Sequence, residues 1–182
     1  FDNKDVRVAL QMAVDNNVLL ELGIDGRGIR AENHHVSPLH PEYAEVPPQV
    51  FDPVKAMEIL TAAGHADTEI ELISIDSEWQ SNTCDVVAAQ LRDAGVKIKR
   101  TVLPSSSYWT GWLEYPFSAT EWGPRPLGVQ ILALAYQTGA AWNESAFSNV
   151  EFDTLLKDAM SISNADSRRV VMAKLEKILQ DE

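Results

Sequence analysis

The sequence predicts an α/β fold in which a mostly parallel sheet is flanked by helices. The prediction rests on the middle of the chain, where two β-rich segments, 68–75 and 96–103, enclose a helical segment, 77–94, that ends at Gly95. Apolar alternation is typical of strands, and a glycine directly after a helical pattern is typical of a helix end. Two parallel strands joined by a helix need a crossover within one sheet. We therefore expect segments 68–75 and 96–103 to be neighbours.

Two helices separated by a long loop are predicted before this βαβ unit. Residues 3–22 place apolar side chains at helical spacing, which favours one amphipathic helix. A second helix begins with Asp52 as its cap and Pro53 in its first turn, and it ends at Gly64. Residues 23–51 lie between them and are rich in glycine and proline, a composition that does not support a long regular element.

After the βαβ unit the pattern predicts a second one and then two closing helices. Residues 105–114 are expected to form a helix and residues 117–122 a strand. Apolar residues at helical spacing around 152–159 and 171–179 predict the two amphipathic helices at the end. No segment is repeated, and a length of 182 residues suits a single domain, 1–182.

Composition limits the classes of function. The chain has 27 acidic and 15 basic residues and a net charge of −12, and no local basic patch offsets it, so we expect no nucleic-acid partner. No run approaches the roughly 18 apolar residues of a membrane helix. Cys84 is the single cysteine, which excludes an internal disulfide and a cysteine-cluster metal site. The chain starts at Phe1 and stops within an apparent helix, so we expect a fragment of a longer protein.

The strongest candidate for a binding site follows the predicted strand 117–122. Residues 101–150 hold nine of the 14 aromatic residues but one basic residue, Arg125. Trp122 lies at the strand end, directly before a turn that contains Gly123 and Arg125, and ligands of open α/β sheets bind beyond such strand ends. A tryptophan face beside one guanidinium suits an organic ligand that bears a carboxylate. The alternative is a surface arginine on a rigid proline turn.

Two other kinds of site are weaker alternatives. His34, His35 and His40 could suggest a metal site, but their spacing matches no zinc pattern, and adjacent residues of an extended loop point to opposite sides. An α/β enzyme could use Glu121 or Asp76 as a general base beside Arg125. No nucleophile motif or phosphate-binding loop accompanies these carboxyl groups.

Several segments, taken in order, resemble the C-terminal lobe of the family 5 extracellular solute-binding proteins, the peptide and nickel class of receptors for ABC importers. The matching segments span nearly the whole chain: 5–15, 51–64, 89–96, 147–156 and 166–179. The resemblance implies lobe II of a type II periplasmic-binding-protein fold, in a two-lobed receptor that closes around its ligand. It also implies three partners, which are a small-molecule or peptide ligand, the N-terminal lobe of the same full-length chain, and an ABC permease at the membrane. The location would be periplasmic, or extracellular and membrane-tethered, with no cofactor and no catalytic residue.

The resemblance also suggests what the candidate site binds. In peptide-binding relatives, the tryptophan at the strand end is followed by an aspartate that pairs with the ammonium group of the peptide. Arg125 replaces that aspartate here, which inverts the charge offered to the ligand. We expect Arg125 to meet an anionic group while Trp122 stacks on the ligand body, with Gly123 as a further ligand-binding residue. Asn33 and His34 are further ligand-binding candidates, because in relatives the long loop approaches the cleft.

Overall fold

The computed structural model describes all residues, 1–182, and they form two compact units. Unit 1 consists of Phe1–Arg30 and Gln49–Trp122, and unit 2 consists of Ala31–Pro48 and Gly123–Glu182. The sequence predicted one domain over 1–182, and these two units lie within it. Each unit is assembled from two separate stretches of chain. Its packing therefore depends on residues that are far apart in the sequence.

A parallel sheet of three strands, in the order β2-β1-β3, forms the centre of unit 1. The central strand β1 (Glu69–Ile75) pairs in parallel with β2 (Lys97–Leu103) along its whole length. The short strand β3 (Ser118–Ala119) pairs with the other edge of β1. The prediction that segments 68–75 and 96–103 are neighbours in one sheet is confirmed.

The third strand is shorter than the predicted 117–122. Ala119 pairs with Ser74, and β1 itself ends one residue later, at Ile75. Beyond that point β1 offers no further backbone for a third strand to pair with, so the chain leaves the sheet. Trp122 therefore lies in an irregular segment rather than at the end of a strand.

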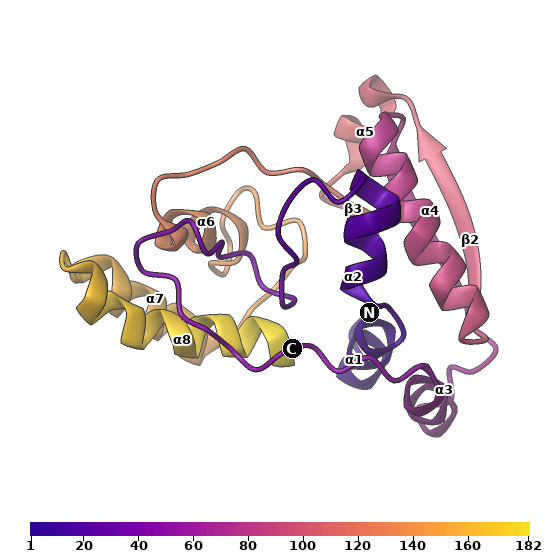
Figure 1. Ribbon diagram of the computed structural model, residues 1–182, viewed down its shortest axis with the longest axis horizontal. Helices are drawn as coiled ribbons and strands as arrows, with labels where there is room; N and C mark the ends of the chain where they lie inside the picture. The colour runs from indigo at the N-terminus through magenta and orange to yellow at the C-terminus, as the bar shows by residue number, and fades with distance from the viewer. The chain divides into compact units, whose positions relative to one another are not determined.

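Three helices of unit 1 bury a common apolar core with the sheet. The helix α4 (Glu78–Asp93) lies beside β2 in Figure 1 and also packs on β1, and it confirms the predicted helix 77–94. The helices α1 (Lys4–Met12) and α3 (Pro53–Ala62) pack against each other. The fully buried side chains of these three helices include Ala9, Ala56, Leu60, Ala88 and Leu91. A continuous core of this kind is the main stabilising contribution to such a unit.

The predicted single helix over residues 3–22 is wrong. The chain turns after α1, and a second helical segment starts with α2 (Asn16–Val18) and continues as a π-helical turn, η1 (Leu19–Gly23). Asp15 causes the break, because its side chain accepts a hydrogen bond from the backbone N–H of Asn17 at 2.8 Å. An aspartate in this position caps the start of a new helix.

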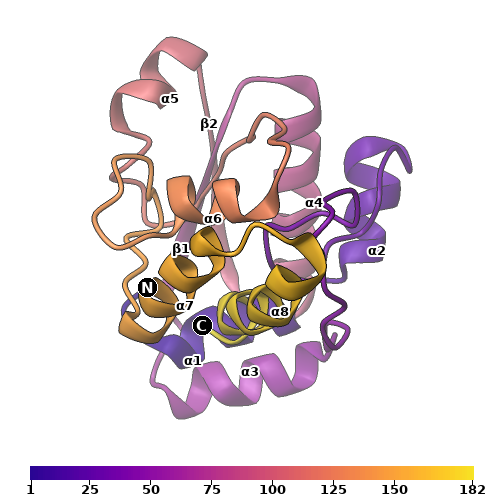
Figure 2. The same ribbon diagram turned by 90° about the vertical axis from the view of Figure 1, so that its left-hand side faces the viewer.

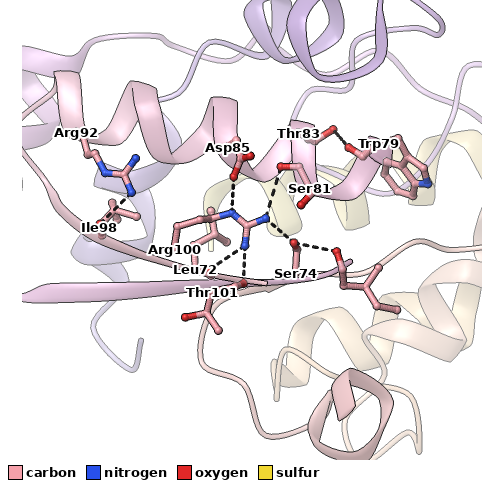
Figure 3. Close-up of polar contacts among 11 residues, drawn as sticks. Leu72, Ser74, Trp79, Ser81, Thr83, Asp85, Arg92, Ile98, Arg100 and Thr101 are labelled. Atoms are coloured by element: carbon pink, nitrogen blue, oxygen red, sulfur yellow. Dashed lines mark hydrogen bonds and ion pairs between the residues drawn. The ribbon is translucent and has the colours of Figure 1, made fainter. Parts of the chain in front are cut away.

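Arg100 ties the sheet of unit 1 to α4 (Figure 3). Its guanidinium lies under the helix with 10% of the side chain exposed, and Nε donates to Oδ1 of Asp85 at 2.9 Å. Nη2 donates to Oγ of Ser74 on β1. Further donations go to the carbonyl oxygens of Leu72, Thr101 and Ser81. One side chain thus joins two strands and a helix.

Unit 2 is built from three helices and the loop 31–48. The helices are α6 (Gly128–Ala135), α7 (Val150–Ser161) and α8 (Ala165–Asp181), and α7 and α8 lie side by side in Figure 2. Their core contains Val36, Leu132, Phe152, Leu156, Met172 and Leu175. The two closing helices were predicted from the sequence, whereas α6 was not. No helix in either unit has both the length and the apolar character needed to cross a membrane.

The helix α8 holds the loop 31–48 by side-chain hydrogen bonds to loop carbonyl groups. Arg169 donates to the carbonyl oxygens of Pro41 and Tyr43 at 2.7 and 3.0 Å. Nearer the end of the helix, Gln180 donates to the carbonyl oxygen of Pro47 at 2.7 Å. Because its prolines have no backbone N–H, the loop makes few backbone hydrogen bonds of its own, and these contacts supply partners for its carbonyl groups.

Candidate functional site

A buried tyrosine anchors the end of β3 in unit 1, just before the predicted site. The helix α5 (Ser105–Gly111) follows β2 and buries Tyr108 completely. The Tyr108 hydroxyl donates to the carbonyl oxygen of Ala119 at 2.9 Å and lies 2.9 Å from Oγ1 of Thr120. These contacts hold the backbone three residues before Trp122 and the side chain two residues before it. The indole of Trp122, which is half-buried, thus extends from an anchored segment of unit 1.

The Arg125 guanidinium has no carboxylate partner. It belongs to unit 2, and its Nη1 donates to the carbonyl oxygens of Gly123 and Pro124, both at 3.1 Å. Its Nε and Nη2 have no acceptor in the chain, and the side chain is partly exposed. A guanidinium with two unused donor atoms can accept a carboxylate or another planar anion.

His40 connects the Arg125 turn to the loop 31–48. Nδ1 of His40 accepts a hydrogen bond from the backbone N–H of Ser37 at 2.9 Å, so it carries no proton. The neutral ring therefore has its proton on Nε2, which lies 3.1 Å from the carbonyl oxygen of Arg125 and donates to it. Both ring nitrogens are used, and the Arg125 backbone is held to the loop.

Asn33 and His34, the other predicted ligand-binding residues, also lie in unit 2. Asn33 has a φ of 57°, in the left-handed region that asparagine tolerates better than most residues. The side chain of His34 is 2% exposed, and its Nδ1 accepts from the backbone N–H of Val36 at 3.3 Å. His34 points toward α8 rather than to solvent, so any contact with a ligand stays a prediction.

Two buried acidic residues beside these positions were missed by the sequence analysis. Glu42 is fully buried, accepts from the backbone N–H of Val129 at 3.2 Å and lies 3.5 Å from Nη1 of Arg168. Arg168 is 7% exposed and caps the end of α7 through the carbonyl oxygens of Ala159 and Ile162. Arg168 thus has several acceptors, whereas Oε2 of Glu42 is buried without a hydrogen-bond partner.

The second buried acid, Glu176, is the more unusual. It lies on α8 and is fully buried. Burial raises its pKa to about 8, an effect that the negative charge of Glu42 strengthens and the backbone N–H of Ala44 opposes. Burial also lowers the pKa of His34, while Glu32 acts in the other direction. Both side chains are therefore neutral near pH 7. No local sequence pattern marks Glu176 as buried, because residues of the distant loop 31–48, such as His34, lie against it.

The three histidines of the metal alternative have separate partners. Nδ1 of His35 lies 3.2 Å from the hydroxyl of Tyr136, while His34 and His40 use their nitrogens as described above. No group of three or more histidine, cysteine, aspartate or glutamate side chains is placed to hold a metal ion. The structure gives the metal alternative no support.

The enzyme alternative lacks an oriented base. Asp76 and Glu121 are both exposed, and neither side chain has a hydrogen-bond partner in the chain that would orient it. Only the backbone of Asp76 is engaged, through its N–H and the carbonyl oxygen of Leu103 at 2.7 Å. A general base needs a fixed position within hydrogen-bond reach of its substrate.

Comparison with known proteins gives one family. Residues 1–143 match the model of the bacterial extracellular solute-binding proteins, family 5 middle region. Heme-binding protein A of Haemophilus influenzae is 25% identical over the whole chain and is matched over 35% of its own length. A glutathione-binding protein of Pectobacterium atrosepticum is 26% identical over 94% of the chain, with 36% of its own length matched. The chain thus spans about a third of these relatives.

Solved structures show the same fold. The oligopeptide-binding protein AppA from Bacillus subtilis superposes on the whole chain with a TM-score of 0.83, at 23% identity, and is covered over 40% of its length. The murein tripeptide binding protein MppA of Escherichia coli superposes on 99% of the chain with a TM-score of 0.86, at 22% identity and 38% coverage. The architecture is that of the type II periplasmic binding proteins, as the sequence predicted.

Proposed function

Because the chain belongs to the bacterial extracellular solute-binding proteins of family 5, we propose that it is the C-terminal ligand-binding lobe of a two-lobed receptor for an ABC importer. The partners of this lobe are the N-terminal lobe of the same full-length chain and a membrane permease. The receptor acts in the periplasm, or outside the cell on a membrane tether. The matched family consists of binding proteins rather than enzymes, which agrees with the absence of an oriented base at Asp76 and Glu121.

The proposed ligand is a small organic or peptide-like solute with an anionic group that binds Arg125. The observation that carries this proposal is the guanidinium without a carboxylate partner, with Nε and Nη2 unused. Two relatives are named for heme and for glutathione, and both compounds carry carboxylates. Trp122 and Gly123 complete the proposed contacts, the indole by stacking on the ligand body and the glycine by leaving the backbone accessible.

Calorimetric titration of the full-length receptor with glutathione, hemin and dialanine tests the proposal. We expect at least one of these probes to bind, and Arg125→Ala to weaken that binding about 10- to 100-fold, since hydrogen bonds to a charged group contribute roughly 1.5–3 kcal/mol. Arg27→Ala is the matched control, because it removes the same charge from a side chain that is 84% exposed and outside the proposed site.

Two results would overturn the proposal at different levels. Equal affinity of wild type and Arg125→Ala for a bound probe would remove the role of Arg125 but leave the receptor function intact. A receptor that binds none of the three probes, and that carries no solute detectable by mass spectrometry after purification from its host, would contradict the receptor function itself.

A further inference from the structure

The turn that carries Arg125 has one hydrogen bond to another segment of the chain. Within residues 123–126, the Nη1 contacts of Arg125 stay inside the turn, and Pro124 and Pro126 have no backbone N–H to donate. The carbonyl oxygen of Arg125 is the exception, because it accepts from Nε2 of His40 at 3.1 Å. The position of the guanidinium therefore depends on what holds His40.

His40 is itself firmly placed. Its backbone N–H donates to the carbonyl oxygen of Ser37 at 2.9 Å, and the backbone N–H of Ser37 returns a bond to Nδ1 at the same distance. The carbonyl oxygen of His40 accepts from the backbone N–H of Tyr43 at 3.1 Å. Arg169 of α8 then holds the carbonyl oxygen of Tyr43. A continuous series of contacts thus leads from α8 through His40 to the backbone of Arg125.

We propose that His40 is a positioning residue for Arg125 and that it thereby sets the preference of the site for anionic ligands. The proposal rests on the proposed function of Arg125. A guanidinium on a loosely held turn loses conformational entropy when an anion binds, and this loss weakens binding. On a turn that is already fixed, most of this entropy has been lost before the anion binds. His40 does not touch the ligand; it holds the backbone from which the guanidinium extends.

Two substitutions separate the two bonds of the His40 ring. The amide of asparagine reaches the place of Nδ1, so His40→Asn keeps the acceptor for the Ser37 N–H and loses the donor to Arg125. The longer glutamine reaches the place of Nε2, so His40→Gln keeps the donor to Arg125. A purely structural role of His40 would make both variants behave alike, and the positioning role makes only His40→Asn defective.

The first measurement needs no ligand. Nuclear magnetic resonance relaxation of the Arg125 backbone N–H and Nε–H, recorded on the full-length receptor, reports how well the turn is ordered. We expect a lower order parameter for Arg125 in His40→Asn and a value near that of wild type in His40→Gln. An Arg125 that is equally ordered in wild type and in His40→Asn overturns the proposal.

The second measurement tests specificity with glutathione and with its diethyl ester, in which the carboxylates are neutralised. We expect His40→Asn to weaken glutathione binding about three- to tenfold and to leave ester binding unchanged, with His40→Gln close to wild type. If Arg125→Ala weakens glutathione binding but His40→Asn does not, the positioning role is wrong and the proposed function stands. If Arg125→Ala has no effect on glutathione binding, the proposed ligand contact of Arg125 fails, while the relaxation data still decide whether His40 positions the turn.

Discussion

Oε2 of Glu176 lies 3.8 Å from Nδ1 of His34, and neither side chain is exposed by more than 2%. The distance is within the range of an ion pair, but the two groups do not form one near pH 7. Burial raises the pKa of Glu176 to about 8 and lowers the pKa of His34. Nδ1 of His34 already accepts a backbone hydrogen bond, so it carries no proton to donate. Unit 2 therefore contains a buried neutral acid beside a neutral imidazole.

The first prediction concerns stability at alkaline pH. Because the pKa of Glu176 is higher in the folded chain than its ordinary value of 4.5, the folded state holds this proton more strongly, and stability falls as pH rises toward 8. We expect Glu176→Gln, which keeps the shape without the charge, to be more stable than wild type at pH 9 by a few kcal/mol at most, since one pKa unit corresponds to about 1.4 kcal/mol.

Denaturant unfolding between pH 6.5 and 9 measures this difference. Wild type should lose stability across the range, and Glu176→Gln should change less. Glu151→Gln is a suitable control, because Glu151 is exposed in the first turn of α7. Parallel stability curves for wild type and Glu176→Gln would show that Glu176 is already ionised at pH 6.5.

The second prediction concerns acid pH. Burial lowers the pKa of His35 to about 4, and the nearby His40 and His34 act in the same direction. A histidine whose pKa is depressed in the folded state binds its proton more readily when unfolded, so stability falls as pH drops from 6.5 toward 4. Asparagine at position 35 keeps an acceptor for the hydroxyl of Tyr136 without a titratable group. We expect His35→Asn to flatten the acid side of the stability profile.

The measurement is the slope of unfolding free energy against pH between 4 and 6.5, which does not depend on any constant cost of the substitution. Tyr136→Phe serves as the comparison, because it removes the hydrogen bond but leaves the histidine. If His35→Asn and wild type have the same slope, His35 is not the source of the acid sensitivity.

The third prediction concerns a close approach at the start of α6. A Cβ atom on Gly128 would lie 2.6 Å from Cγ1 of Val36 and 3.4 Å from Cε of Met172, both in the buried core of unit 2. We expect Gly128→Ala to destabilise the chain by about 1–3 kcal/mol through overpacking. The same change should cost far less in a Val36→Ala background, where space for the new methyl group exists.

A double-mutant cycle of Gly128→Ala and Val36→Ala, read by denaturant unfolding, isolates this coupling. Additive effects of the two substitutions would mean that the new methyl group does not meet Val36.

The fourth prediction concerns the two partners of an ion pair in unit 1, which should contribute unequally. Arg100 is 10% exposed and has acceptors on two strands and a helix, whereas Asp85 is 60% exposed (Figure 3). We expect Arg100→Met to cost about 2–4 kcal/mol, because it leaves buried carbonyl groups without a donor. Asp85→Ala should cost under about 1 kcal/mol, as is usual for an exposed partner. Equal losses in thermal or denaturant unfolding would mean that the pair with Asp85, rather than the buried acceptors, carries the contribution of Arg100.

The sequence predicted those elements whose ends are marked by neighbouring residues. The helix α4 and the two strands around it follow from local alternation and from Gly95, which has a φ of 101° and suits a helix end. The helix α6 was missed because Leu127, which precedes it, has no side-chain oxygen to cap the helix. The N–H of Leu127 donates to Oε1 of Gln130 at 3.1 Å, and Glu42 accepts from the N–H of Val129 from 87 positions away. A tertiary cap of this kind leaves no short-range pattern.

For the candidate site too, the sequence predicted what local composition marks and missed what depends on distant contacts. Arg125 could be singled out because it is the one basic residue among many aromatic ones, and the structure gives it no carboxylate partner. The burial of His34 could not be foreseen, since it depends on Glu176 and α8, more than a hundred positions later in the chain. His40 was considered only as a metal ligand, because a hydrogen bond to a distant carbonyl group has no signature in the sequence.

The contacts of α8 also set the order in which unit 2 can form. Gln180 reaches the carbonyl oxygen of Glu32 across 148 positions, and Arg169 reaches that of Tyr43 across 126. Contacts with such large sequence separation form slowly, because a long stretch of chain must first be brought together. On the ribosome, residues 31–48 emerge well before α8, so they lack these partners until α8 has also been made. The loop that carries His40 is thus made well before α8 and becomes ordered only once α8 has formed.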